Sequence, residues 1–115
     1  MSIEVVGPPV SLDDLRRMAA EQFGDFVKAV VDVGQGLMAI GGELHADEEA
    51  VLLERGAQQA DLWGINLYPD RPSDELVEFD SMINVRPAQG NRSRGVEDPT
   101  RQRQILDVVA RLVVR

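Results

Sequence analysis

The sequence predicts a single α+β domain in which helices pack on one face of a mainly antiparallel sheet. Its 115 residues are enough for one domain with one core. Its strand-like runs come in pairs that are joined by short, turn-rich loops. Its helical stretches carry start and stop signals at their ends. The expected order is β-α-β-β-α-β-β-α over residues 1–115, without repeats or linkers.

The chain is expected to begin with a short strand and a helix. The run IEVV at 3–6 favours a strand, which ends at the GPP that follows it, because proline cannot donate to a strand ladder. Ser11 with Asp14 three residues later is typical of a capping box at a helix start. The apolar face that begins at Leu15 stops at Gly24.

A β-hairpin and a second helix are expected next. The apolar runs FVKAVVDV and LMAIGG flank GQG, which is typical of a hairpin loop. Val27, Ala29, Val31 and Val33 then share one face of the first strand. The segment HADEEAVLLERG opens with acids and ends at Gly56, as a short helix does.

The last third of the chain predicts a second hairpin and a C-terminal helix. DLWGINLY and ELVEFDSMINVR flank the turn-rich PDRPSD. In the second run one face carries Val77, Phe79, Ser81, Ile83 and Val85, and the other carries Glu78, Asp80, Met82, Asn84 and Arg86. Asp98 and Pro99 suit the N-cap and first position of the helix. We expect Val77, Phe79, Ile83 and Val85 to pack against Ile105, Val109 and Leu112 of that helix.

Three longer stretches have distinctive amino-acid sequences: GGELHADEEAVLLERG (41–56), DLWGINLYP (61–69) and INVRPAQGNRSRGVEDP (83–99). They resemble the signature stretches of a small prokaryotic family that is catalogued only as a domain of unknown function. The resemblance covers nearly the whole chain, and it implies no activity, cofactor or catalytic residue.

Composition excludes several classes of protein. The net charge of -8 and the pI of about 4.5 argue against binding to nucleic acid or to anionic membranes, which rests on a positive field. No apolar stretch approaches the roughly 18 residues that cross a bilayer, and the first residues do not look like a signal peptide. The absence of cysteine excludes disulfides and thiolate metal sites. We therefore expect a cytoplasmic protein without a membrane partner, and no cofactor is indicated.

Charge is unevenly distributed along the chain. Residues 43–80 contain eleven acidic residues against two arginines. Residues 86–103 reverse this balance, with five arginines against Glu97 and Asp98. The chain therefore carries a basic segment inside an acidic protein.

The first candidate site is Glu43, His45 and Asp47. If the preceding strand continues through them, their side chains share one face and form a carboxylate-histidine-carboxylate set for a divalent metal or for acid-base catalysis. If the helix has already begun, this alignment is lost. His45 is then a turn or capping residue, and the acids that follow complement the helix dipole. We favour the second interpretation and expect His45 near the start of the second helix, with no metal.

The second candidate site is the segment RPAQGNRSRGVEDP (86–99). Its glycines free backbone amides, and it leads into a helix N-terminus, which favours anions. The candidate ligand-binding residues are Asn84, Arg86, Asn91, Arg92, Ser93 and Arg94, to which Asn66 of the neighbouring strand is a further addition. The alternative is that Arg92 and Arg94 pair with internal carboxylates and only fix a long loop. The segment contains neither a P-loop nor a Rossmann fingerprint.

Three functional hypotheses follow. The leading one is a small binding domain that holds a phosphate- or carboxylate-bearing ligand at residues 84–95. The second is an enzyme in which Glu43, His45 and Asp47 supply a metal or a general base that faces a substrate anchored by the arginines. The third is a protein-interaction module in which the acidic middle of one copy meets the basic loop of the next, giving a homo-oligomer.

Overall fold

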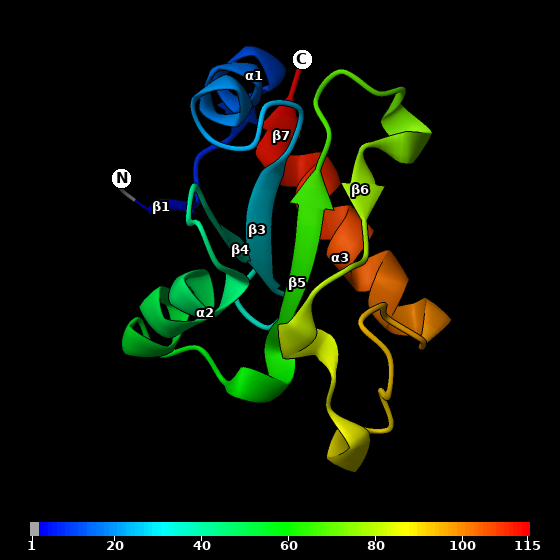
Figure 1. The fold of residues 1–115 in the computed structure, drawn as a ribbon. Coiled ribbons are helices and arrows are strands. Elements are labelled where there is room, and N and C mark those ends of the chain that lie inside the picture. The colour runs from blue at the N-terminus through cyan, green and yellow to red at the C-terminus, as the bar shows by residue number, and fades with distance from the viewer. Residues whose placement is uncertain (1–2) are drawn as a thin grey trace.

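A computed structural model describes residues 3–115 (Figure 1). Its helices are α1 (Leu12–Glu21), α2 (His45–Glu54) and α3 (Pro99–Leu112). Its strands are β1 (Glu4–Val6), β2 (Val10–Ser11), β3 (Val27–Asp32), β4 (Leu37–Ile40), β5 (Leu62–Leu67), β6 (Val77–Glu78) and β7 (Val113–Val114). Short 3-10 turns lie at Gln59–Asp61, Ser73–Glu75, Met82–Asn84 and Pro87–Gln89. The α+β fold class is confirmed, and the order of the larger elements is close to the expected one.

The main sheet has five strands within the described residues, in the order β1-β4-β3-β5-β6, and all its neighbours are antiparallel. The expected hairpin of β3 and β4 is confirmed, with Val31 opposite Met38. β2 and β7 form a separate, two-residue parallel pair that brings the end of the chain beside the start of α1. This pair was not expected from the sequence.

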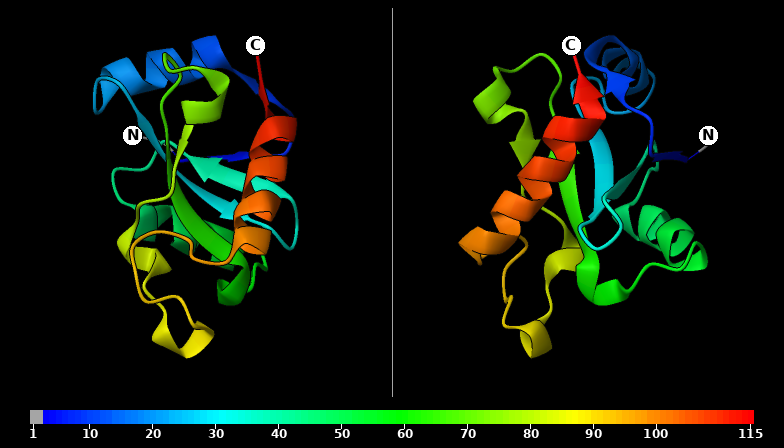
Figure 2. Two further views of the ribbon diagram at one scale, coloured as in Figure 1. Left: turned by 90° about the vertical axis from the view of Figure 1, so that its right-hand side faces the viewer. Right: turned by 180° about the vertical axis from the view of Figure 1, so that it is seen from behind.

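Helices cover both faces of the sheet, which corrects the expectation of helices on one face. The larger core holds Val27, Ala29 and Val31 of β3 together with residues of α1 and α3. A second apolar cluster on the opposite face joins Val30 of β3 to Leu52 of α2. Figure 2 shows α3 in front of the sheet when the molecule is seen from behind. β3 has Val27, Ala29 and Val31 buried on one face and Val30 buried on the other, so a helix packs on each side of it.

The expected strand over 75–86 is wrong beyond its first residues. Only Val77 and Glu78 pair with β5, and Met82–Asn84 forms a 3-10 turn. Val77 and Phe79 do pack against the core that contains α3. Ile83 packs instead against the cluster on the α2 side of the sheet, and Val85 is 38% exposed. The alternating pattern therefore reflects contacts with two different cores rather than one long strand.

The expected helix ends are confirmed. Ser11 and Asp14 form a reciprocal capping box at α1, with the Asp14 amide donating to Ser11 Oγ at 3.0 Å. Asp98 caps α3 by accepting from the Thr100 amide at 2.9 Å, and Pro99 is the first helical residue. Within residues 3–115 no helix is both long enough and apolar enough to cross a bilayer.

Candidate functional site

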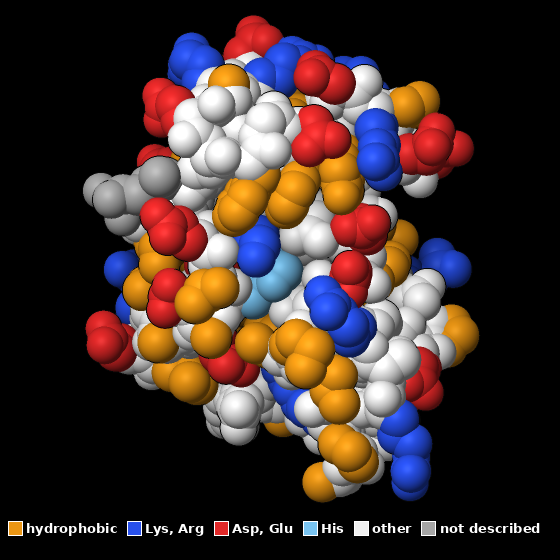
Figure 3. Space-filling model, in the orientation of Figure 1, with side chains coloured by type: hydrophobic (Ala, Val, Ile, Leu, Met, Phe, Trp, Pro, Cys, Tyr) orange, Lys and Arg blue, Asp and Glu red, His pale blue; other side chains and the backbone are white. Residues whose placement is uncertain are grey.

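His45 and Arg94, one residue from each candidate site of the sequence, line the same pocket. This pocket, which we call the α2 pocket, has a volume of about 500 Å³. Its polar lining residues are Lys28, His45, Asn66, Tyr68, Glu78, Asp80, Ser81 and Arg94. In Figure 3 the single histidine of the chain, in pale blue, is visible near the centre of this face, with blue cationic side chains close by. The fold thus joins residues that are far apart in the sequence.

The floor of the α2 pocket is a row of polar side chains across three strands. Lys28 of β3 is in register with Asn66 of β5, and Asn66 is in register with Glu78 of β6. Residues in register on antiparallel neighbours point to the same face of the sheet. The row therefore places a cation, an amide and a carboxylate side by side.

Neutral donors hold Glu78 in place. Its Oε1 accepts from Asn66 Nδ2 at 2.8 Å and from the Tyr68 hydroxyl at 3.1 Å. Burial and the bond to Glu78 raise the pKa of Tyr68, so its hydroxyl keeps the proton that it donates. Both donors use the same oxygen of Glu78, and neither of them carries a charge.

His45 is the first residue of α2 and is 9% exposed. Its Nε2 lies 2.8 Å from the carbonyl oxygen of Ile65. Since a carbonyl oxygen only accepts, Nε2 carries the proton, and Nδ1 of the neutral ring is an acceptor. Burial lowers the pKa of His45, and the positive charges of Lys28 and Arg94 lower it further. The Ile65 carbonyl and Asp80 oppose this shift, and the ring is neutral at neutral pH.

Arg94 and Asp80 form an ion pair on the wall of the pocket. Arg94 Nε lies 2.6 Å from Asp80 Oδ1, and both side chains are about half exposed, at 57% and 43%. Only Nε of the guanidinium takes part in this hydrogen bond, and a guanidinium offers five N–H groups. Arg94 can therefore bind an anion while it stays paired with Asp80.

Apolar side chains surround the polar floor. Leu44 and Met82 line the pocket and are 56% and 66% exposed. Phe26 also lines it and lies between Phe23, at 4.8 Å between ring centroids, and Tyr68, at 5.4 Å. The rings pack on each other, so this edge is an apolar wall rather than a set of free stacking faces.

The asparagines of the second candidate site form hydrogen bonds with backbone groups and do not line the α2 pocket. Asn84 is completely buried, and its amide bonds both the N–H and the C=O of Gly64, at 2.8 and 2.9 Å, and the carbonyl of Arg94 at 2.9 Å. Asn91 Nδ2 donates to the carbonyls of Asn84 and Gly95, at 2.8 Å each. Both residues fix the loop that carries Arg94.

The charged and hydroxyl side chains of the same segment also make internal contacts. Arg86 donates to the carbonyls of Ile83 and Gln59 at 2.9 Å each and to that of Leu62. Ser93 Oγ accepts from the Gly95 amide at 3.2 Å. Neither residue lines the α2 pocket.

An internal carboxylate occupies the loop amides. The Arg92 and Ser93 amides both donate to Glu97 Oε2 at 2.8 Å. These hydrogen bonds lower the pKa of Glu97, the Arg92 amide contributing most. The Arg92 side chain is exposed and does not line the α2 pocket. Of the six candidate ligand-binding residues, Arg94 alone lines the α2 pocket.

The structure separates Glu43, His45 and Asp47. β4 ends at Ile40 and α2 begins at His45, so the strand alignment does not form, and the expectation of His45 at the helix start is confirmed. Glu43 and Asp47 are exposed and do not line the pocket. Within the described residues no group of three or more acidic or histidine side chains is placed to hold a metal ion.

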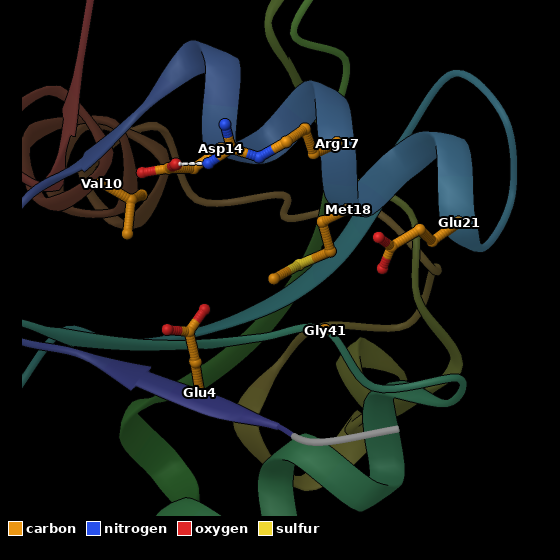
Figure 4. Close-up of a pocket in the computed structure, with 7 residues that line it drawn as sticks. All are labelled: Glu4, Val10, Asp14, Arg17, Met18, Glu21 and Gly41. Atoms are coloured by element: carbon orange, nitrogen blue, oxygen red, sulfur yellow. Dashed lines mark hydrogen bonds and ion pairs between the residues drawn. The ribbon is translucent and has the colours of Figure 1, made fainter.

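Two other pockets are less suited to a polar ligand. One, of about 420 Å³, lies between β1 and α1, where Glu4 faces Met18 and Glu21 across the opening (Figure 4). Arg17, the only cation among the described residues that line it, is paired with Asp14. The other, of about 600 Å³, is a mainly apolar groove along α3. The groove also has two cations, Arg71 and Arg115, and the α2 pocket alone among the three combines two cations with a buried histidine.

Sequence reasoning missed most of this pocket. It named His45, Arg94 and Asn66, but not Lys28, Tyr68 or the role of Glu78. One signal was present, because Lys28 interrupts an apolar run at a position that alternates away from Val27 and Ala29.

Comparison with known proteins identifies a family without adding a function. Neither the curated proteins nor the solved structures include a significant match. The model of the family described as "Protein of unknown function (DUF5674)" matches residues 4–112. This match spans almost the entire chain, as the resemblance noted from the sequence implied, and the chain belongs to the DUF5674 family.

Proposed function

We propose that the chain is a small binding domain that holds a phosphate- or carboxylate-bearing small molecule in the α2 pocket. The observation that carries this proposal is the presence of Lys28 and Arg94 beside a buried, neutral His45. Lys28 has no carboxylate within 4.0 Å among residues 3–115, and Arg94 uses only Nε for Asp80. An anion placed between these cations would accept charge-assisted hydrogen bonds in a partly dry pocket.

The proposed anion site is the α2 pocket and not the backbone amides of the loop at residues 90–95. The amides of Arg92 and Ser93 already bind the carboxylate of Glu97, whereas Arg94 stands where a ligand can reach it. Several polar groups that converge in one pocket with apolar walls are the usual composition of a small-molecule site.

The cellular setting belongs to the same proposal. A cytoplasmic location is supported by the absence of cysteine, and the net charge of -8 disfavours nucleic acid as a partner. Self-association through the acidic middle and the basic loop is a separate hypothesis, supported by their opposite charges, and the binding function needs only one chain.

The first test replaces one cation at a time. We expect Lys28→Met and Arg94→Met each to weaken binding of acetate or phosphate about tenfold, because each removes one charge-assisted contact. Arg92→Met is the matched control, since it removes the same charge two residues from Arg94 but outside the pocket. Isothermal titration of the three variants and the wild type measures the effect. Equal affinities in all four proteins would show that the anion does not bind here.

The second test uses pH. A bound anion beside His45 favours its charged form, so we expect affinity for acetate to rise severalfold from about pH 7.5 to about pH 5.5. Lys28, Asp80 and Arg94 also act on His45, and Glu78 lies on the same floor, so the variant His45→Gln provides the comparison. Its affinity should change little over this range. The same pH dependence in both proteins would assign the effect to another group.

A further inference from the structure

The α2 pocket contains a separated pair of opposite charges. Among the described residues Lys28 has no carboxylate within 4.0 Å, and Glu78 has no cation within that distance. Among residues 3–115, Glu78 receives side-chain hydrogen bonds only from the neutral Asn66 amide and Tyr68 hydroxyl, both at Oε1. The fold therefore keeps one positive and one negative charge in the same pocket without joining them.

The sheet sets the spacing of the two backbone positions that carry these charges. Lys28, Asn66 and Glu78 are in register on three neighbouring strands. Neighbouring strands lie about 4.8 Å apart, so the backbones of Lys28 and Glu78 are about 10 Å apart. The two side chains start from neighbouring positions of one sheet face, so a small ligand can accept a charge-assisted hydrogen bond from Lys28 and donate one to Glu78.

Asn66, in the middle of the row, has a side-chain acceptor that lacks a hydrogen-bond donor among the described residues. Asn66 is 7% exposed, and its Nδ2 already donates to Glu78. Its Oδ1 is buried and has no hydrogen-bond partner among residues 3–115. A buried acceptor without a donor is costly, and it favours a ligand that brings an N–H or O–H group to this position.

We propose that the ligand of the α2 pocket is a zwitterion of the amino-acid type, whose acidic group binds Lys28 and Arg94 and whose ammonium group binds Glu78. This inference rests on the proposed function and narrows its ligand class. The ammonium group supplies the donor that Asn66 Oδ1 lacks. The exposed Leu44 and Met82 at the edge of the pocket provide contacts for an apolar side chain.

Three matched probes test the inference on the full chain by isothermal titration. Leucine carries both charges, 4-methylpentanoate is leucine without its amino group, and 3-methylbutylamine is leucine without its carboxylate. We expect leucine to bind about tenfold more tightly than either analogue, because each analogue loses one charge-assisted contact. Equal affinity for leucine and 4-methylpentanoate would overturn the zwitterion and leave the acidic-ligand function intact. Failure of leucine and of every acid, acetate and phosphate included, would overturn both.

Glu78→Gln separates charge from structure. Glutamine keeps an oxygen for Asn66 and Tyr68 but removes the negative charge that the ammonium group needs. We expect this variant to bind leucine and 4-methylpentanoate equally, with its affinity for the acid not reduced. Glu75→Gln is the matched control, since Glu75 is exposed and lies outside the pocket, and it should keep the preference for leucine. A preference that survives in Glu78→Gln would overturn the role of Glu78 and with it the proposal.

Discussion

Replacement of Asn84 by alanine is expected to lower the free energy of unfolding by about 4 kcal/mol. Asn84 is completely buried, and its amide satisfies three backbone groups: the N–H of Gly64 at 2.8 Å, the C=O of Gly64 at 2.9 Å and the C=O of Arg94 at 2.9 Å. Alanine leaves all three without this partner. Each buried polar group that loses its hydrogen bond costs about 1 to 3 kcal/mol.

Urea unfolding of Asn84→Ala and of two companions measures this effect. Asn84→Asp retains an acceptor for the Gly64 amide but loses both donors, so it should also be strongly destabilised. Val85→Ala, next along the chain at a 38% exposed side chain, is the control and should change stability by less than about 1 kcal/mol. A loss in Asn84→Ala no larger than that of Val85→Ala would refute the structural role given to Asn84.

Glu48→Gln is expected to stabilise the protein at neutral pH and to do so far less in acid. Glu48 is completely buried on α2, and burial raises its pKa to about 9. Its Oε2 accepts from the Gly42 amide at 2.9 Å, and within the described residues its Oε1 has no partner. Glutamine keeps an oxygen for the Gly42 amide and carries no charge at any pH.

The direction of the pH dependence follows from the raised pKa. Since the folded protein holds this proton more tightly than the unfolded chain, the stability contributed by the protonated carboxyl is complete below the unfolded pKa. This stability is lost progressively as pH rises from the unfolded pKa through the folded value of about 9. Each pH unit above the unfolded pKa of 4.5 lowers the free energy of unfolding by about 1.36 kcal/mol, so the buried carboxyl lowers it by about 3 kcal/mol at pH 7.

Urea unfolding at about pH 5 and at pH 7 tests this expectation. The stability advantage of Glu48→Gln over the wild type should reach about 3 kcal/mol at pH 7 and fall to less than about 1 kcal/mol at the lower pH. The titration of His45 is common to both proteins and cancels in the comparison. Glu54→Gln removes an exposed charge from the same helix and should show no such difference. An advantage of the same size at both pH values would mean that Glu48 is not the titrating group.

Local signals in the sequence predicted the elements that local interactions define. The Ser11 and Asp14 capping box, the Asp98 cap of α3 and the start of α2 at His45 each depend on contacts within a few residues. The β3–β4 hairpin belongs to the same group, because its loop is short and both strands are apolar. Such elements can be read from spacing and residue type alone.

The segment after β6 shows where periodicity fails. Residues 77–85 alternate like a strand, yet Phe79 and Ile83 pack on opposite sides of the sheet. The side chain of Asn84, which bonds Gly64 of β5, takes the place of a strand ladder. A buried asparagine that replaces backbone pairing leaves no periodic signal, and the partner of its amide is 20 residues away.

The candidate site could be predicted only in fragments. His45 and Arg94 were singled out in separate patterns, and only the enzyme hypothesis brought the two groups to one substrate. The row of Lys28, Asn66 and Glu78 depends on the register of three strands, and register is set by tertiary packing. The ligand-binding expectation for residues 84–95 did not account for Glu97, whose carboxylate binds the loop amides.

The position at which a small anion perturbs the backbone amides tests the proposed binding site most directly. In an NMR titration of the isotope-labelled full chain with phosphate, we expect the largest amide shift changes at Lys28, His45 and Asn66. The amides of Arg92 and Ser93, which are bound to Glu97, should change little. The largest changes at Arg92 and Ser93, with Lys28, His45 and Asn66 unchanged, would place the anion at the loop and contradict a binding site in the α2 pocket.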